Sequence, residues 1–269
     1  MAIEVVMHFM LRNIFLAAIC LGLIAGHSLA EEKIITWATN SHYPPYDWAV
    51  SESEYAGACV ELLSLIAPKG YVFRPVVVPW ARAQEMAKRG EIDLLVNIRV
   101  TPDRSAWLDF SSNPTFQNPI VVFMRKNKAI PFKSWDELKP LLGGTTLGDA
   151  FGNGFDEYWK KNLRVEVITS MSANFSKLNA GRIDYFVSGY YMGMAFLAHS
   201  EYREQIVALG TPISNNPIHL GFSKLSPHRD VLPEIDRKLR ALGADGSLSR
   251  ILKNQLQKIA DNPQFVFPE

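Results

Sequence analysis

The stretch EIDLLVNIRVTPDRSAWLDFSS, residues 91–112, carries the clearest structural pattern in this chain. Residues 92–98 are rich in Ile, Leu and Val, which predicts a short strand buried on both faces. Thr101 then suits a helix N-cap, Pro102 suits the first helical position, and Asp103 places negative charge in the first turn. The stretch therefore predicts a strand that runs directly into the start of a helix.

Arg104 lies in this predicted first turn. A guanidinium beside unpaired backbone N–H groups, at the carboxyl end of a strand, is suited to bind a carboxylate or a phosphate. The alternative is structural, because Arg104 could pair with a nearby acid such as Asp109 and brace the turn. The local pattern leaves both interpretations open.

The composition is that of an ordinary globular protein with room for one large domain or two medium ones. The chain has 269 residues, of which 48% are hydrophobic and 20% are charged, and its formal net charge is +1. A net charge this close to zero, without a basic cluster, gives no electrostatic reason to expect a nucleic-acid partner.

The first thirty residues have the pattern of a secretory signal peptide. Arg12 precedes an apolar run at residues 14–25, and Ser28-Leu29-Ala30 is a small-x-small cleavage pattern. We predict cleavage after Ala30 and a periplasmic mature protein. A signal anchor is the alternative, although the run is shorter than the roughly 18 residues of a membrane span. Initiation at Met7 or Met10 would give a shorter leader, so the start codon stays open.

Few residues indicate catalysis or metal binding. Cys59 is the only cysteine after the predicted leader, and its apolar helical surroundings indicate a small buried side chain rather than a nucleophile. The chain has no H-E-x-x-H or G-x-S-x-G motif, and its histidines lack metal-ligand spacing. We therefore expect no metal, no cofactor and no catalytic residue.

Residues 33–98 alternate between predicted strands and helices. Strands are expected at residues 33–39, 71–78 and 92–98, and helices at residues 58–67 and 81–89. This order predicts a mostly parallel sheet with helices on both faces. Ligands of such sheets bind beyond the carboxyl ends of the strands, so the candidate site comprises the loops at residues 42–48, 79–82 and 99–104.

A second alternating series follows. Strands are expected at residues 120–124, 145–147, 165–169, 183–187 and 218–222, and helices at residues 156–161, 173–179, 190–199, 231–242 and 248–259. The whole pattern predicts an α/β protein of two lobes, with residues 31–117 and 218–269 in the first lobe and residues 118–217 inserted as the second. Two extended crossings, near residues 118–121 and 212–218, would form a two-segment hinge.

Several motifs occur in the order typical of one protein family. They are a strand followed by HYPPY at residues 34–46, RGEID at residues 89–93, TPDRSAWLDFS at residues 101–111, AGRID at residues 180–184 and DGSLSRILK at residues 245–253. Together they resemble the family 3 periplasmic solute-binding proteins, which include the amino-acid receptors of ABC importers. The resemblance implies the two-lobed type II periplasmic binding protein fold and capture of a solute by hinge closure.

The resemblance also implies roles for four matching residues. Arg104 matches the arginine that binds the ligand α-carboxylate in the amino-acid receptors, and Thr101 matches the threonine three residues before it. Tyr43 matches an aromatic residue of the first loop, and Trp80 matches an aromatic residue that packs on the ligand. For Tyr43 and Trp80, a purely structural role is the alternative.

Three differences from the amino-acid receptors bear on the ligand. Arg99 lies where small hydroxyl residues are usual, and Gly152-Asn153-Gly154 lies where Gly-Ser-Thr is common. Gly189 replaces the acid that pairs with the ligand α-ammonium. Burying an ammonium group without a counter-ion would weaken ligand binding by on the order of several kcal/mol, because the charge loses its hydration. Either Asp149 or Asp156 supplies the charge, or the ligand has no amine.

The glycines at residues 148–154 do not form a nucleotide-binding motif. Their spacing is neither G-x-G-x-x-G nor a Walker loop with Lys and Ser or Thr. We expect backbone N–H groups of this loop to approach the ligand at the start of the next helix, opposite Arg104. A flexible turn without contact to a ligand is the alternative.

Two classes of function remain. The first is a monomeric, non-enzymatic receptor that binds a small carboxylate-bearing solute, an amino acid or a related organic acid, for an ABC permease. The second is an enzyme on the same scaffold, because periplasmic cyclohexadienyl dehydratases resemble this family. His42, Asp149 and Glu157 are then candidate general acids. A detached sensor module that signals through a separate partner is a further alternative.

Overall fold

The computed structural model describes residues 32–149 and 151–268. The predicted signal peptide, residues 1–30, lies outside these described residues. The chain from Ile34 onward forms one compact unit. Within the described residues, no helix has the length and apolar character needed to cross a membrane.

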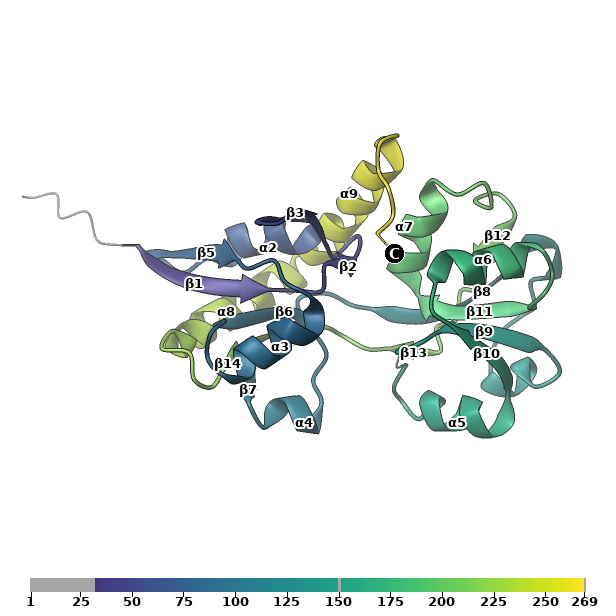
Figure 1. Cartoon of the computed structure of the whole chain (residues 1–269), viewed down its shortest axis with the longest axis horizontal. Coiled ribbons are helices and arrows are strands. Elements are labelled where there is room, and N and C mark those ends of the chain that lie inside the picture. The colour runs from purple at the N-terminus through teal and green to yellow at the C-terminus, as the bar shows by residue number, and fades with distance from the viewer. Residues whose placement is uncertain (1–31, 150, 269) are drawn as a thin grey trace, which may run out of the picture. The chain divides into compact units, whose positions relative to one another are not determined.

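The first sheet has five strands in the order β5–β1–β6–β14–β7. They are β1 (Lys33–Ala38), β5 (Tyr71–Pro75), β6 (Leu94–Ile98), β7 (Leu108–Phe110) and β14 (His219–Ser223). Strands β1 and β6 are parallel, whereas β14 is antiparallel to both β6 and β7. Beside it lie α2 (Ala58–Ile66), α3 (Trp80–Lys88), α4 (Pro102–Ser105), α8 (Leu232–Ala244) and α9 (Ser247–Asp261) (Figure 1). We call this part lobe 1.

The second sheet has the order β10–β9–β11–β8–β12, with β13 also paired to β8. Its strands are β8 (Pro119–Arg125), β9 (Leu142–Thr146), β10 (Arg164–Ile168), β11 (Tyr185–Gly189), β12 (Ile206–Ala208) and β13 (Ser214–Asn215). Strand β9 is parallel to β10 and β11, whereas β8 is antiparallel to its three partners. The helices of this part, lobe 2, are α5 (Phe155–Asn162), α6 (Met171–Asn179) and α7 (Tyr190–Ala198).

The predicted α/β fold with two sheets is confirmed, but the prediction of mostly parallel sheets was too simple. Both sheets are mixed. The antiparallel strands are those next to the crossings, because β8 carries the chain out of lobe 1 and β14 brings it back. The parallel strands of the first sheet run toward the second lobe. A strand that returns from that lobe therefore runs in the opposite direction and pairs antiparallel.

Strand β6 shows why the stretch at residues 91–112 has such a clear pattern. All five of its residues are buried. Leu94 and Val96 join one hydrophobic cluster with α2, α8 and α9, whereas Leu95 and Ile98 join another with α3. Since side chains alternate across a strand, an unbroken apolar run is what a strand covered on both faces requires. Lobe 2 has its own two clusters, one on each face of its sheet.

A small antiparallel sheet was missed by the sequence analysis, which had its residues in a loop. It consists of β2 (His42–Tyr43), β3 (Asp47–Ser51) and β4 (Glu54–Ala56). These strands have two to five residues, too few for period-2 alternation to be recognised. Three short 3₁₀ helices, η1 (Lys126–Lys128), η2 (Trp135–Leu138) and η3 (Arg229–Val231), complete the described elements.

Two extended segments connect the lobes, as Figure 1 shows. The two segments pair with each other next to β8 and β14. Phe116 forms a β-bridge with Ile218, and the backbone N–H of Thr115 donates to Ile218 O at 2.8 Å. The predicted boundaries at residues 117/118 and 217/218, and the hinge itself, stay predictions.

Candidate functional site

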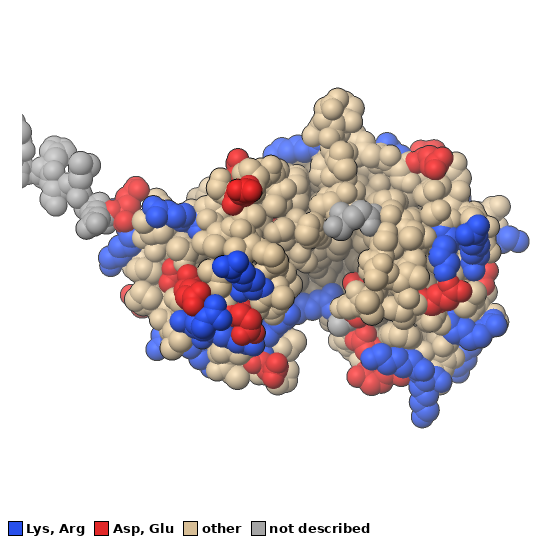
Figure 2. Space-filling model, viewed as in Figure 1, with Lys and Arg blue, Asp and Glu red and all other residues tan. Residues whose placement is uncertain are grey.

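A cavity of about 670 Å³ lies between the two lobes. Figure 2 shows the hollow in the surface, with basic atoms visible inside it. From lobe 1, the lining includes His42, Tyr43, Trp80, Gln84, Lys88, Asn97, Arg99, Thr101, Asp103 and Arg104. From lobe 2, it includes Thr146, Gly148, Asp149, Phe151, Met171, Ser188, Gly189 and Met192. The cavity is of the size that small-molecule sites typically have.

Helix α3 presents one face to the cavity. Trp80, Gln84 and Lys88 line it at a spacing of four residues, while Ala83 and Ala87 are buried against lobe 1. Residues four apart lie on the same side of a helix, so Gln84 and Lys88 face the cavity because Trp80 does. The sequence analysis identified Trp80 but missed Gln84 and Lys88, which the same periodicity could have found.

Arg104 is fixed by its own turn. The Thr101 hydroxyl accepts a hydrogen bond from the Arg104 backbone N–H at 3.2 Å, which is the predicted N-cap. The guanidinium donates to the carbonyl oxygen of Arg99 at 3.1 Å and to Gln84 Oε1 at 3.4 Å. Because α4 has only four residues, its dipole is small, and the positive guanidinium is the main group here that could bind an anion.

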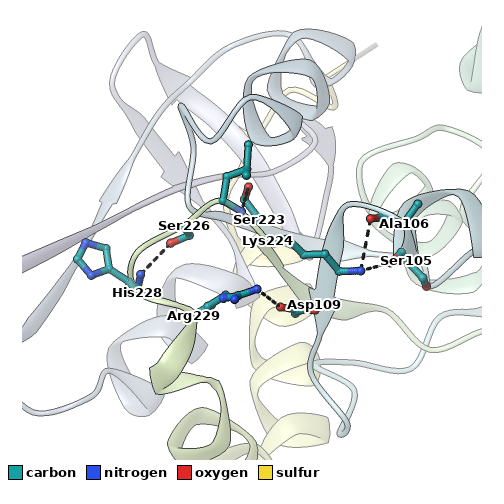
Figure 3. Close-up of polar contacts among 9 residues, drawn as sticks. Ser105, Ala106, Asp109, Ser223, Lys224, Ser226, His228 and Arg229 are labelled. Carbon is teal, nitrogen blue, oxygen red and sulfur yellow. Dashed lines mark hydrogen bonds and ion pairs between the residues drawn. The ribbon is translucent and has the colours of Figure 1, made fainter.

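The alternative partner of Arg104, Asp109, pairs elsewhere. Arg229 Nη1 lies 3.3 Å from Asp109 Oδ2, and Figure 3 shows the two side chains pointing toward each other. Lys224 braces the turn instead, because its Nζ donates to the carbonyl oxygen of Ser105 at 2.7 Å. Among the described residues, Arg104 makes no ion pair, so its charge is available to a ligand.

Arg99 lies close to several cavity groups. Its positive charge acts on Arg104, whose pKa is lowered first by burial and then by Arg99. An arginine remains protonated at any ordinary pH, so the two like charges repel each other. An anion bound next to both guanidinium groups would relieve this repulsion.

Tyr43 is held at the junction of the lobes. Asn118 Nδ2 donates to the Tyr43 hydroxyl at 2.6 Å, and the Tyr43 ring packs 4.8 Å from the ring of Tyr46. Burial raises the pKa of Tyr43 to about 12, although Arg99 opposes the shift. The hydroxyl is therefore neutral and can donate a hydrogen bond. Tyr43 combines a packing role with a place in the cavity wall.

Asp149 is the acid that lobe 2 brings to the cavity. Desolvation raises the pKa of Asp149 to about 6, and the charge of Arg99 opposes this shift. The side chain is nevertheless accessible to solvent, because the cavity is open. We therefore expect the desolvation of this carboxylate to increase when a solute fills the cavity. The other acid considered, Asp156, is not among the lining residues.

Gly189 lines the cavity at the end of β11. A Cβ atom at this position would lie 3.2 Å from Asn118 Oδ1. The Asn118 amide would therefore have to shift by a few tenths of an ångström to admit a side chain at residue 189. The uncharged residues Ser188 and Asn118 also line the cavity.

The glycine-rich loop differs from the expectation. Gly152, Asn153 and Gly154 are not among the lining residues, whereas Gly148, Asp149 and Phe151 are. The backbone N–H groups of Phe151 and Gly152 donate to the Asp156 carboxylate at 3.0 and 2.7 Å. These donors are therefore used within the loop, at the start of α5. A role of residues 152–154 in ligand binding stays a prediction.

A buried polar network supports the cavity wall from behind. Asn97 lines the cavity with a left-handed backbone (φ 53°), and its Nδ2 donates to Asp47 Oδ2 at 2.5 Å. Thr39 donates to the same oxygen at 2.8 Å, and Thr115 donates to Asn97 Oδ1 at 2.8 Å. Burial raises the pKa of Asp47 to about 7. The network connects the cavity to the segment that leaves lobe 1.

Two of the remaining candidates for chemistry, Cys59 and Glu157, do not line the cavity. Cys59 is fully buried, and its burial, together with nearby Asp47, raises the pKa of its thiol well above the usual value. A thiol held neutral is a poor nucleophile. His42 and Asp149 line the cavity, but Glu157 does not. Within residues 32–149 and 151–268, no three His, Cys, Asp or Glu side chains form a group that could hold a metal ion.

The sequence analysis missed several lining residues. They are Asn97 and Asn118 on the lobe 1 side, Met171 and Met192 from lobe 2, and Phe267 and Pro268 from the segment after α9. Asn97 lies near the carboxyl end of the predicted strand at residues 92–98, where ligands of such sheets bind, so its place in the cavity could have been predicted. Phe267 and Pro268 had no local signal, because only the packing of the final segment brings them to the cavity.

Residues 35–258 match the model of the bacterial extracellular solute-binding proteins, family 3. The match covers most of the chain, so the protein belongs to this family. The family consists mainly of non-enzymatic binding proteins, although enzymatic members exist. Among curated proteins, none matches the chain.

Three solved structures illustrate the shared fold. Substrate-binding domain 2 of Lactococcus lactis GlnP in the open conformation has a TM-score of 0.65 at 19% identity, over 84% of this chain and 97% of that chain. The amino acid ABC transporter substrate-binding protein AbpA of Streptococcus pneumoniae, bound to L-arginine, has a TM-score of 0.64 at 14% identity, over 85% and 97%. The ancestral amino acid-binding protein AncCDT-1, a precursor of cyclohexadienyl dehydratase, has 0.60 at 18%, over 83% and 95%. At these identities the similarity establishes the fold.

Proposed function

We propose that this protein is a periplasmic receptor that captures a small carboxylate-bearing solute, an amino acid or a related organic acid, between its two lobes. The solute would bind first to lobe 1 and become enclosed by hinge closure. Two of the similar structures are substrate-binding proteins of amino acid ABC transporters, one of them bound to L-arginine, which supports an ABC permease as the partner. The predicted signal peptide supports export to the periplasm.

One observation carries this proposal: the Arg104 guanidinium lies in the cavity without an ion-pair partner among the described residues. An Arg–carboxylate hydrogen bond contributes on the order of 1.5–3 kcal/mol. Micromolar affinity requires about 8 kcal/mol. The remainder would come from the Trp80 and Tyr43 rings, from Thr101, and from groups of lobe 2 after closure.

The test is calorimetric titration of the purified protein with a panel of amino acids and organic acids. Arg104→Ala is expected to abolish measurable binding of any solute found, because it removes the positive charge and the N–H donors of the guanidinium. Arg82→Ala is the matched control, since Arg82 is an exposed arginine on α3 that does not line the cavity. Equal affinity in the Arg104→Ala variant would refute the site.

A second candidate is an enzyme of the cyclohexadienyl dehydratase type. It is favoured by two lining residues, His42 and Asp149, and by the similarity to the ancestral precursor of such an enzyme. A general acid must lie next to the departing group of its substrate. Incubation with prephenate or arogenate distinguishes the candidates, because an enzyme releases carbon dioxide and an aromatic product whereas a receptor leaves the compound unchanged.

A further inference from the structure

The segment after α9 reaches the candidate cavity. Phe267 and Pro268 line this cavity together with residues of both lobes. The match to the family model ends at residue 258, so this segment lies beyond the part that the family model describes.

Aromatic contacts hold the segment against both lobes. The Phe265 ring lies 5.5 Å from the Trp48 ring of β3 in lobe 1 and 6.0 Å from the His199 ring at the end of α7 in lobe 2. The Phe267 ring lies 5.6 Å from Phe196 of α7 in an edge-on arrangement. Such contacts between aromatic rings are favourable beyond the area that they bury.

The same region is fixed by the end of α9. His199 Nε2 lies 2.5 Å from the carbonyl oxygen of Ile259, so the imidazole N–H donates to the end of that helix. Helices α7 and α9 also pack on each other. Val266, between the two phenylalanines, is 82% exposed. The segment is therefore extended, with Phe265 and Phe267 directed inward and Val266 outward.

Phe267 gives the cavity an apolar wall. Met171 at the start of α6, Met192 in α7 and Phe151 also line it, so large apolar side chains from lobe 2 and the final segment form part of the cavity wall. Methionine side chains adapt their shape to a bound group, and an aromatic ring offers a large rigid surface. The positively charged lining residues Lys88, Arg99 and Arg104 all come from lobe 1, whereas lobe 2 contributes the acid Asp149.

We propose that Phe267 and Pro268 of the final segment are part of the ligand-binding site, and that Phe267, Met171 and Met192 form an apolar subsite. The solute then carries an apolar group beside its carboxylate, for example a branched aliphatic or aromatic side chain. This inference rests on the proposed function, since the lobe 1 arginines bind the acidic group. It adds the apolar half of the ligand and assigns it to the final segment.

Matched pairs of acids test this subsite. The probes are glycine with L-leucine, glycine with L-phenylalanine, and acetate with phenylacetate, each titrated calorimetrically into the full mature chain. The apolar member of at least one pair is expected to bind at least tenfold tighter, which corresponds to about 1.4 kcal/mol. Phe267→Ala is expected to lower that affinity about tenfold, whereas Val266→Ala, whose side chain faces solvent, is expected to leave it unchanged.

The outcomes separate this inference from the proposed function. If carboxylates bind but Phe267→Ala behaves like Val266→Ala, or if the small member of each pair binds equally well, the apolar subsite is wrong and the receptor function stands. If no carboxylate binds, the proposed function fails and the inference fails with it.

Phe267→Leu is the second variant in case Phe267→Ala does not fold, because it keeps apolar volume but loses the ring. The Phe267→Leu protein is expected to bind the apolar acid more weakly than wild type but still measurably. If Phe267→Leu binds it as tightly as wild type, the role of the ring is overturned.

Discussion

Replacing Asp47 with Asn should remove a pH dependence of stability that the buried carboxylate creates. Asp47 is fully buried, and burial raises its pKa from 3.8 to about 7 in the folded protein. Hydrogen bonds from Asn97 and Thr39 favour the charged form but do not compensate for the desolvation. Its Oδ1 has no hydrogen-bond partner among the described residues.

The sign follows from proton binding. Between pH 3.8 and about 7, the folded chain holds a proton on Asp47 that the unfolded chain has released. The contribution of this group to stability is therefore fully present below pH 4 and is lost as the pH rises to about 7. A pKa difference of this size corresponds to on the order of 4 kcal/mol. In the wild-type protein, other groups titrate in the same range, so the difference between two variants is the informative quantity.

The assay is urea unfolding of the wild-type and Asp47→Asn proteins from pH 4 to pH 8. The asparagine stays neutral and can still accept from Asn97 and Thr39, so the variant should gain stability relative to wild type as the pH rises. The expected relative gain is a few kcal/mol, on the order of the full linkage. Asp230→Asn, at an exposed site, is the control and should change little. Parallel stability profiles for wild type and Asp47→Asn would refute the reasoning.

Two further predictions concern glycines. Gly57→Ala should destabilise the fold by about 3 kcal/mol or more in thermal unfolding, because φ is +123° and a Cβ atom would lie 2.3 Å from the carbonyl oxygen of Tyr46. Gly70→Ala, with positive φ but nothing within 4 Å, should cost about 1 kcal/mol, and an equal effect of both changes would contradict the steric argument. Gly189→Asp should lower stability by about 1–2 kcal/mol, because Asn118 must move and lose a hydrogen bond. An unchanged melting temperature would show that Asn118 does not fill that space.

Much of the fold could be predicted because its signals are local. The Thr101 N-cap, the Pro102 first turn and the unbroken apolar run of β6 depend on neighbours within a few residues. Six of the residues predicted to bind the ligand line one cavity, and their role stays a prediction: Arg104, Arg99, Thr101, Tyr43, Trp80 and Gly189. Residues 152–154 do not line this cavity, and the backbone N–H of Gly152 donates to Asp156 within the loop, so their role also stays a prediction.

The sequence by itself determined the alternation of strands and helices, the capped turn that carries Arg104, and the family, because capping and periodicity are short-range properties of the chain. Tertiary structure alone decided which charges remain unpaired and which side chains reach the cavity. Arg229 takes Asp109 from more than a hundred residues away, Asn118 fills the space beside Gly189, and Phe267 arrives from the final segment. Such contacts depend on how distant elements pack, and no local pattern encodes them.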